Sequence, residues 1–219
     1  MKLYGYWRSS AAYRVRIALN LKGLQAEHIS VHLVKDGGQQ HKPEYIDLNP
    51  QELVPTLVIK NTASESELKL TQSLAIIDYL EQVAPDVNLL PKSAASRAVV
   101  NSMALLVACD VHPLNNLGIL QYLSNELEVS DEQKSAWYHH WIHKGFKALE
   151  VLLEQHSGQY CFGDSVTLAD VCLIPQVYNA KRFNVPLDDY PNINRIWDNC
   201  NQLDSFKMAL PENQEDAVI

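Results

Sequence analysis

Residues 2–33 read KLYGYWRSSAAYRVRIALNLKGLQAEHISVHL, and the class of the fold can be inferred by starting from this run. Residues 2–6 are rich in aromatic and aliphatic side chains, and residues 27–33 alternate apolar with polar ones, so both predict strands. From Ser10 the apolar spacing becomes that of a helix, with Gly23 where a C-cap belongs. The apolar face of this helix is formed by Ala11, Val15, Ala18 and Leu19. A β-α-β order predicts a parallel strand pair with a right-handed crossover.

The same pattern continues to about residue 84. Residues 56–59 and 68–70 predict two further strands on either side of a polar turn, and Gln72-Ser73 opens a second helix. This order, βαβ-loop-ββα, is that of a thioredoxin-like domain, which we place at residues 1–84. The rest of the chain has almost no strand signal, and residues 91–219 are expected to form an all-α domain. The helices are predicted at 93–127 with a break at Pro113, and at 131–156, 167–182 and 193–203.

Composition excludes several classes of protein. In 219 residues, 47% of side chains are hydrophobic and 20% are charged, which is typical of a globular protein rather than a disordered or fibrous one. The net charge of −8 and the lack of a basic patch argue against nucleic acid or an anionic membrane as a partner. The N-terminus lacks a signal-like apolar segment, and the four cysteines show no metal-type spacing. We therefore expect a cytoplasmic protein with reduced thiols.

Ser9 and Ser10 lie where the first predicted strand meets the first predicted helix. The unpaired N–H groups and the positive dipole end of a helix N-terminus favour anions, thiolates included. A serine hydroxyl at this place can donate to a sulfur and hold it as the reactive thiolate. No cysteine of the chain lies nearby, so the thiol would come from a ligand. The alternative is that one of these serines only caps the helix.

Two further places suggest ligand contacts. Pro55 leads into a strand and could form a cis bond that turns the backbone of Val54 toward a ligand, although an ordinary trans proline is the commoner case. Gln72 and Ser73 open a helix whose N–H groups and hydroxyl suit a carboxylate, with a cap as the alternative.

Polar residues also interrupt the first long helix of the second domain. They surround Pro113 and comprise Asp110, His112, Asn115 and Asn116. A site or internal hydrogen bonds would explain them equally well. Thr167 and Asp170, by contrast, have the spacing of an acidic capping box, so we interpret them as structural.

His139 and His143 have the i, i+4 spacing of a pair of metal ligands. They fall on a polar stripe with Lys147, Glu150 and Glu154, and no third ligand is apparent. A solvated helix face is therefore the favoured interpretation, and we predict no metal.

Taken together, these motifs resemble the zeta-class glutathione transferases, a family that includes maleylacetoacetate isomerase of tyrosine breakdown and the maleylpyruvate isomerases. The likeness covers nearly the whole chain in order. The matching segments are residues 4–19, 38–40, 48–57, 72–80, 112–116, 167–170 and 175–183.

The resemblance implies a glutathione-dependent isomerase that converts a maleyl dicarboxylate to its fumaryl isomer by reversible thiolate addition. It implies that Ser9 activates the glutathione thiol beside Ser10, and that Arg8 and Arg182 hold the carboxylates of the substrate. The residues implied to bind glutathione are Ser9, Ser10, Gln40, Val54 (before a cis Pro55), Gln72, Ser73, His112, Asn116 and Leu117. The family also implies a homodimer.

This chain departs from the family at two positions. The family cysteine two places after the first serine is Ala11, and His112 stands where glutamine is common. Two other functions therefore stay open. One is a general glutathione transferase that conjugates small electrophiles, and the other is a non-catalytic transferase-like binding module.

Overall fold

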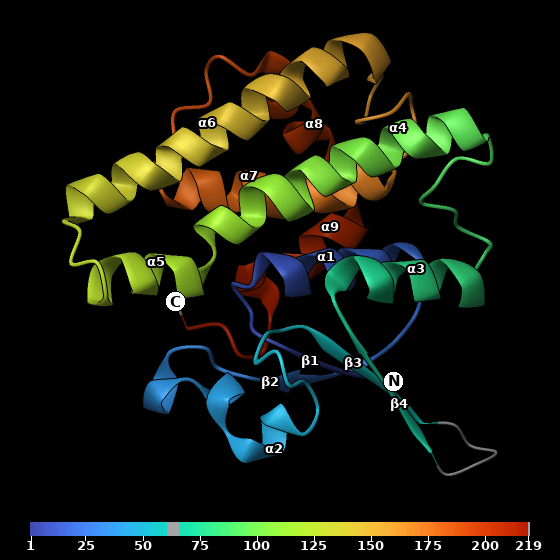
Figure 1. The fold of residues 1–219 in the computed structure, drawn as a ribbon. Helices are drawn as coiled ribbons and strands as arrows, with labels where there is room; N and C mark the ends of the chain where they lie inside the picture. Colours follow the sequence, from blue (N-terminus) through green and yellow to red (C-terminus); the bar gives the residue numbers. More distant parts are fainter. Residues whose placement is uncertain (61–65, 219) are drawn as a thin grey trace. The chain divides into compact units, whose positions relative to one another are not determined.

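The computed structural model describes residues 1–60 and 66–218, and it divides into two compact units (Figure 1). The sheet unit comprises Met1–Asn88 together with Leu203–Ile219, and the helical unit comprises Leu89–Gln202. An all-α domain that continues to residue 219 was expected. The C-terminal segment instead belongs to the sheet unit, because its helix α9 (Asp204–Ala209) packs on α1 (Ser10–Leu21).

The sheet unit is built on a four-stranded mixed sheet with the order β2-β1-β3-β4. The first two strands in the chain are parallel, as predicted from the β-α-β order, and the other pairs are antiparallel. Leu3 and Leu57 face each other across β1 and β3, and both are buried. The strands are β1 (Lys2–Gly5), β2 (Glu27–Ser30), β3 (Thr56–Lys60) and β4 (Glu67–Thr71).

Helices α1 and α3 (Ser73–Val83) lie along one face of this sheet (Figure 1). The thioredoxin-like order βαβ-ββα is thereby confirmed. The connection between β2 and β3 carries two short 3-10 turns and α2 (Pro43–Ile46). Most of the polar turn expected over residues 61–67 lies outside the described residues.

A buried ion pair joins α1 to α3. Lys22 Nζ lies 2.7 Å from Glu81 Oε1, and both side chains are almost fully buried. The same ammonium donates to the carbonyl oxygens of Ala84 and Val87, just past the end of α3. Such a pair is costly to bury unless its other hydrogen bonds are satisfied, as they are here for the ammonium. It holds the two helices in register, and their N-termini carry the predicted site residues.

The helical unit begins with an apolar stretch that is long and apolar enough, by length and composition, to cross a membrane. This stretch, Ala94–Asn125, is broken into four pieces, and its first helix packs on α7 (Leu168–Arg182). One such stretch is weak evidence for a membrane span. The pieces are α4 (Ala94–Leu105), a π-helix (Leu106–Val111), a 3-10 helix (His112–Asn115) and α5 (Leu117–Asn125). The break predicted at Pro113 is confirmed, and the π-helix extends it toward the N-terminus.

Helix α6 (Asp131–His156) has the predicted bounds. It begins at Asp131 because Ser130 caps it in a capping box. Helix α7 is buried on all sides from Leu168 to Val177, as expected of a central helix. Helix α8 (Pro191–Cys200) packs on both α6 and α7.

Candidate active site

Ser9 is the N-cap of α1. Its Oγ accepts a hydrogen bond from the N–H of Ala12 at 3.2 Å. The helix cap considered as the alternative role of this serine is therefore present. The hydroxyl proton of Ser9 is not donated to any group in the described part of the chain. The same oxygen can therefore cap the helix and still donate outward, toward an anion attracted by the helix end. Ser10 follows as the first, buried residue of the helix.

Arg8 precedes this cap on the turn between β1 and α1. Its guanidinium lies 4.5 Å from the centroid of the Trp7 ring and donates to the hydroxyl of Tyr6 at 3.1 Å. Its Nε is buried and has no partner within the described residues. Stacking on an aromatic face restricts an arginine while its remaining donors stay available for a carboxylate.

The N-terminus of α3 brings Gln72 and Ser73 together. Gln72 has φ of 64°, a left-handed conformation that is uncommon for a residue with a side chain, and its amide donates to Gln51 Oε1 at 2.9 Å. Backbone strain of this kind occurs preferentially at functional sites. Ser73 is buried, and its Oγ accepts from Arg14 Nη1 at 3.3 Å. The first turn of α3 thus offers backbone N–H groups and an oriented hydroxyl beside a guanidinium.

Sequence reasoning did not assign Arg14 to the site. Arg14 is only 2% exposed, although it stands in the run YRVRIAL on the central helix of the sheet unit. Long charged side chains are almost never fully buried unless they are paired. The available signal was therefore an arginine flanked by apolar residues on a helix that the sheet unit buries.

The Val54–Pro55 peptide bond is cis, as the resemblance implied. The carbonyl of Leu53 just before it accepts from Tyr45 Oη and from Asn49 Nδ2, both at 2.6 Å. Burial raises the pKa of Tyr45, which keeps its hydroxyl protonated as a donor. Within the described residues, the backbone N–H and C=O of Val54 have no partner. They are available for an extended peptide ligand.

Gln40 lies in the connection after β2 and is 6% exposed. Its Oε1 is buried without a partner in the described chain, while its Nε2 lies 2.9 Å from His41 Nε2. His41 in turn pairs with Glu52 through Nδ1. Gly38 has φ of 98°, and a Cβ there would lie 2.6 Å from the Gln40 amide nitrogen. The glycine therefore makes room for the glutamine, whose free oxygen can accept from a ligand.

Other predicted site residues belong to the helical unit. Asn116 is the N-cap of α5, and its Oδ1 accepts from the N–H of Ile119 at 3.0 Å. Leu117 is the first residue of that helix, and both residues are partly exposed. His112 is partly exposed and opens the 3-10 helix.

Of the two explanations left open for the polar cluster around Pro113, the structure shows the internal hydrogen bond. Asn115 is buried and donates to the backbone oxygen of Tyr138 on α6 at 3.3 Å, an internal bond between helices. Its own Oδ1 has no partner within the described residues.

Arg182 is the last residue of α7 and is exposed, with its guanidinium 4.6 Å from the ring centroid of Phe183. The Phe183 ring is stacked on Tyr138 at 4.1 Å. Burial strongly raises the pKa of Tyr138, while the charge of Arg182 lowers it, so the hydroxyl stays neutral. Tyr138 thus contacts both Phe183, next to Arg182, and Asn115 of the 3-10 helix that His112 opens.

The solvated stripe predicted on α6 is only partly correct: Lys147 and Glu154 are exposed, but the other three residues are not. His139 lies 3.0 Å from the backbone oxygen of Phe183 through Nε2, and His143 lies 2.7 Å from the hydroxyl of Tyr190 through Nδ1. Glu150 is buried and accepts from the first N–H groups of α8. These three residues pack against neighbouring segments, which offer them hydrogen-bond partners. No group of metal-binding side chains occurs in the part of the chain that the structure describes.

The capping box at Thr167 and Asp170 is confirmed as structural. The Asp170 carboxylate is fully buried and accepts from the N–H groups of Cys161 and Thr167, both at 2.8 Å. Burial raises the pKa of Asp170, and these hydrogen bonds oppose that shift. All four cysteines are free thiols, and three of them are buried.

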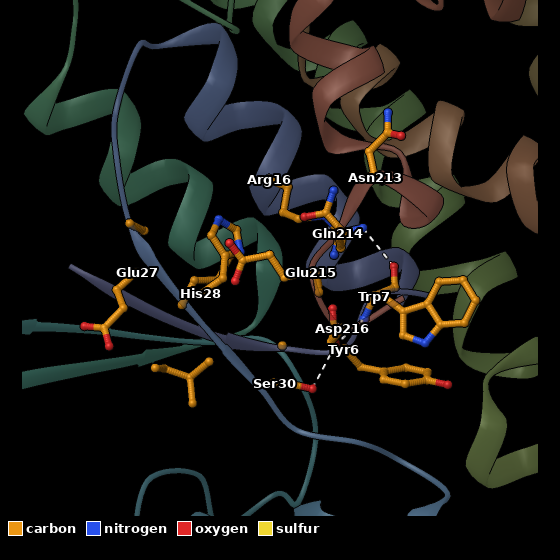
Figure 2. A pocket seen from close by; sticks show the side chains of 15 residues that line it. Tyr6, Trp7, Arg16, Glu27, His28, Ser30, Asn213, Gln214, Glu215 and Asp216 are labelled. Atoms are coloured by element: carbon orange, nitrogen blue, oxygen red, sulfur yellow. Dashed lines mark hydrogen bonds between the residues drawn. The ribbon is translucent and has the colours of Figure 1, made fainter. Parts of the chain in front are cut away.

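A cavity of about 640 Å³ lies beside the turn that carries Arg8 and Ser9 (Figure 2). It is lined by residues of β1 and the turn after it, of α1, of the edge strand β2 and of the C-terminal segment, including Trp7, Arg16 and Asp216. Ser9 is not part of its lining. The cavity therefore lies next to the candidate site and is distinct from it.

Comparison with known proteins agrees with this arrangement. The glutathione S-transferase N-terminal domain matches residues 3–88, and the corresponding C-terminal domain matches residues 116–209. A probable maleylacetoacetate isomerase of Vibrio cholerae is 52% identical over 98% of this chain and 97% of its own. A holo maleylpyruvate isomerase, described as a bacterial zeta-class transferase, superposes with a TM-score of 0.92 at 44% identity over the whole of both chains. A maleylacetoacetate isomerase of Methylobacterium extorquens with bound malonate and glutathione also gives 0.92, at 39% identity over both full chains.

Proposed function

Because the chain belongs to the glutathione S-transferase family over both of its domains, we propose that it is a glutathione-dependent cis–trans isomerase. Its substrate is maleylacetoacetate or maleylpyruvate, and its product is the fumaryl isomer. The observation that carries this proposal is the Ser9 hydroxyl, which caps α1 and retains its proton for an anion at the helix end.

Glutathione fits the groups that the sheet unit leaves unsatisfied. Val54 has a free backbone N–H and C=O, which suit the cysteinyl part of the tripeptide. Ser73 and the N–H groups of α3 suit its γ-glutamyl carboxylate, with Gln72 beside them. The buried, unpartnered Oε1 of Gln40 needs a hydrogen-bond donor, and the amides of a peptide supply one.

When bound, glutathione supplies a thiolate that adds reversibly to the cis double bond, so that the bond can rotate before it re-forms as trans. The Ser9 hydroxyl donates a hydrogen bond to the sulfur. With the positive end of α1, it stabilises the thiolate over the thiol. Ser10 keeps the helix start in place, because it is buried immediately behind Ser9.

Arg8 and Arg182 hold the two carboxylates of the substrate. Each guanidinium stacks on an aromatic ring, Trp7 and Phe183 respectively, so its orientation is restricted. A planar guanidinium binds a carboxylate through two parallel hydrogen bonds, which a lysine cannot reproduce. The positive charge of these arginines would also stabilise negative charge that develops on the substrate. In the helical unit, His112, Asn116 and Leu117 add further contacts to glutathione.

A second candidate function is conjugation of small electrophiles. It is favoured by Ala11, which stands where the family has a cysteine, so a thiol that assists isomerisation there is missing. The two functions differ in the fate of glutathione, which an isomerase regenerates and a conjugating transferase consumes.

We further propose a cytoplasmic homodimer that acts in the breakdown of tyrosine or a related aromatic compound. The isomerase names of the relatives favour a role in the breakdown of aromatic compounds, whereas the cytoplasm and the homodimer rest on the sequence and the family resemblance. Sedimentation velocity tests the dimer, which is expected at about twice the mass of one chain; a single monomer peak at micromolar concentration would contradict it.

The test of the main proposal is the conversion of maleylacetoacetate or maleylpyruvate, followed by ultraviolet absorbance with and without glutathione. The free thiol is titrated before and after the reaction. Conversion that requires glutathione and leaves its concentration unchanged is the expected result. Thiol loss that matches turnover would identify a conjugating transferase, and a chain that fails to bind glutathione at all would be a non-catalytic module.

A further inference from the structure

The position of Ser9 depends on a tight turn between β1 and α1. The N–H of Ser9 donates to the carbonyl of Tyr6 at 2.9 Å, so Trp7 and Arg8 occupy the two central positions of this turn. The positions of Arg8 and Ser9, the two proposed catalytic residues, therefore depend on how the peptide groups of Trp7 are oriented.

The backbone of Trp7 is held on both sides by residues from elsewhere. Its N–H donates to Asp216 Oδ2 at 3.2 Å, and its carbonyl accepts from Arg16 Nη2 at 2.9 Å. Figure 2 shows Asp216 beside this turn, at the edge of the cavity. Asp216 is separated from Trp7 by 209 positions in the chain.

Asp216 is itself fixed by the edge of the sheet. Ser30, the last residue of β2, donates its hydroxyl to the same Oδ2 at 2.9 Å (Figure 2). The rest of the C-terminal segment is tied to α1. Arg16 donates from Nε to the carbonyl of Ala209 at 3.1 Å, and Asn20 donates to that of Ser205 at 2.9 Å. The C-terminal segment, which is bonded to α1, thus places the Asp216 carboxylate beside the turn.

We propose that Asp216 is a positioning residue for Ser9, and this proposal rests on the proposed isomerase function. The carboxylate fixes the Trp7 peptide and thereby aims the Ser9 hydroxyl at the sulfur of bound glutathione. Asp216 is only partly buried, and its replacement leaves in place the bonds from Arg16 and Asn20 that tie the C-terminal segment to α1. The helix keeps its cap without it, because Ser9 itself bonds to Ala12. Catalysis is more demanding than folding, since a misplacement of about 1 Å can lower the rate by about a hundredfold.

The decisive variant is Asp216→Ala in the full-length protein, measured by steady-state kinetics. We expect kcat to fall about tenfold because the turn can shift, with KM for glutathione within about twofold of the wild type. The KM is preserved because Val54, Gln72 and Ser73 bind the tripeptide independently of this turn. Amide hydrogen exchange over residues 7–9 is expected to be faster than in the wild type, which reports the loosened turn directly.

Asp216→Asn is the rescue variant. Trp7 and Ser30 donate to one oxygen, Oδ2, and an asparagine carbonyl oxygen placed there accepts both bonds. We expect kcat of this variant to stay within about threefold of the wild type. The matched control is Glu215→Ala, which removes the neighbouring negative charge of an exposed residue that makes no hydrogen bond within the described chain. Its kinetics are expected to equal those of the wild type.

Three outcomes would overturn the inference. They are a wild-type kcat for Asp216→Ala, an equal loss for Asp216→Ala and Glu215→Ala, and a loss that only follows a fall in melting temperature. A failure of the proposed function looks different, because the wild-type chain itself would then show no glutathione-dependent conversion.

Discussion

Arg14 and Ser73 are separated by 59 positions, yet the guanidinium of Arg14 donates to the hydroxyl oxygen of Ser73 at 3.3 Å. Both side chains are buried, so this bond is shielded from water and stronger than an exposed one. Because one lone pair of the Ser73 oxygen is occupied, its proton points elsewhere and can be donated to a ligand carboxylate. Helix α1 thereby prepares a binding group at the start of α3.

Replacing Ser73 with alanine should weaken the binding of glutathione rather than slow the chemistry. We expect KM for glutathione to rise about tenfold and kcat to change less than twofold, since a contact at the γ-glutamyl end is made equally in the ground state and the transition state. Steady-state kinetics and calorimetric titration measure both. Ser102→Ala, which removes an exposed hydroxyl of α4, is the control. A fall in kcat with unchanged KM would contradict this role.

Ser9→Ala should lower turnover far more than stability. Loss of the N-cap costs about 1 kcal/mol of unfolding free energy. Loss of the thiolate-stabilising hydroxyl should reduce kcat about a hundredfold. Ser130→Ala is a matched control, because Ser130 caps α6 through the same kind of bond to the N–H of Gln133. If the two variants lose stability and activity alike, Ser9 is only a cap.

Acid should destabilise the protein in part through His28. Partial burial lowers the pKa of His28 from 6.5 although the residue keeps some exposure; the charge of Arg16 also lowers it, while Asp216 and Glu215 oppose the shift. As the pH falls, the unfolded chain therefore binds a proton at His28 before the folded chain does. The contribution of neutral His28 to the free energy of unfolding is complete above pH 6.5 and is lost as the pH falls through the lower pKa of the folded state. Urea unfolding of His28→Asn between about pH 7.5 and pH 5 should show a smaller loss than the wild type. Equal losses would exclude His28 as a contributor.

Asp170→Ala should destabilise the helical unit. It leaves the N–H groups of Cys161 and Thr167 without their acceptor in a fully buried place. We expect the free energy of unfolding to fall by about 3 kcal/mol, because an unsatisfied buried donor costs about 1–3 kcal/mol. Urea denaturation measures this. Thr167→Ala, which removes one hydroxyl bond to Asp170, should cost less, and a loss of less than 1 kcal/mol for Asp170→Ala would contradict the assignment.

Local signals predicted much of the fold because they depend on neighbours in the chain. The bounds of α6 were predicted to the residue, and the start of this helix has a local cause in the structure, because Ser130 and Gln133 form a capping box within one turn. The parallel pairing of β1 with β2 followed from their spacing around α1. The residues of the candidate site, from Ser9 to Ser73, could be named because they stand at helix starts or match a family motif.

Tertiary structure decided the partners of these residues. The polar stripe with His139 and His143 was predicted to face solvent, because periodicity reports polarity but not which helix packs against it. The pairing of Trp7 with Asp216 likewise joins groups from opposite ends of the chain. The sequence by itself thus determined the helices, the strands and the chemistry at their ends. Which buried polar groups satisfy one another was decided only when the folded chain brought distant donors and acceptors within bonding distance.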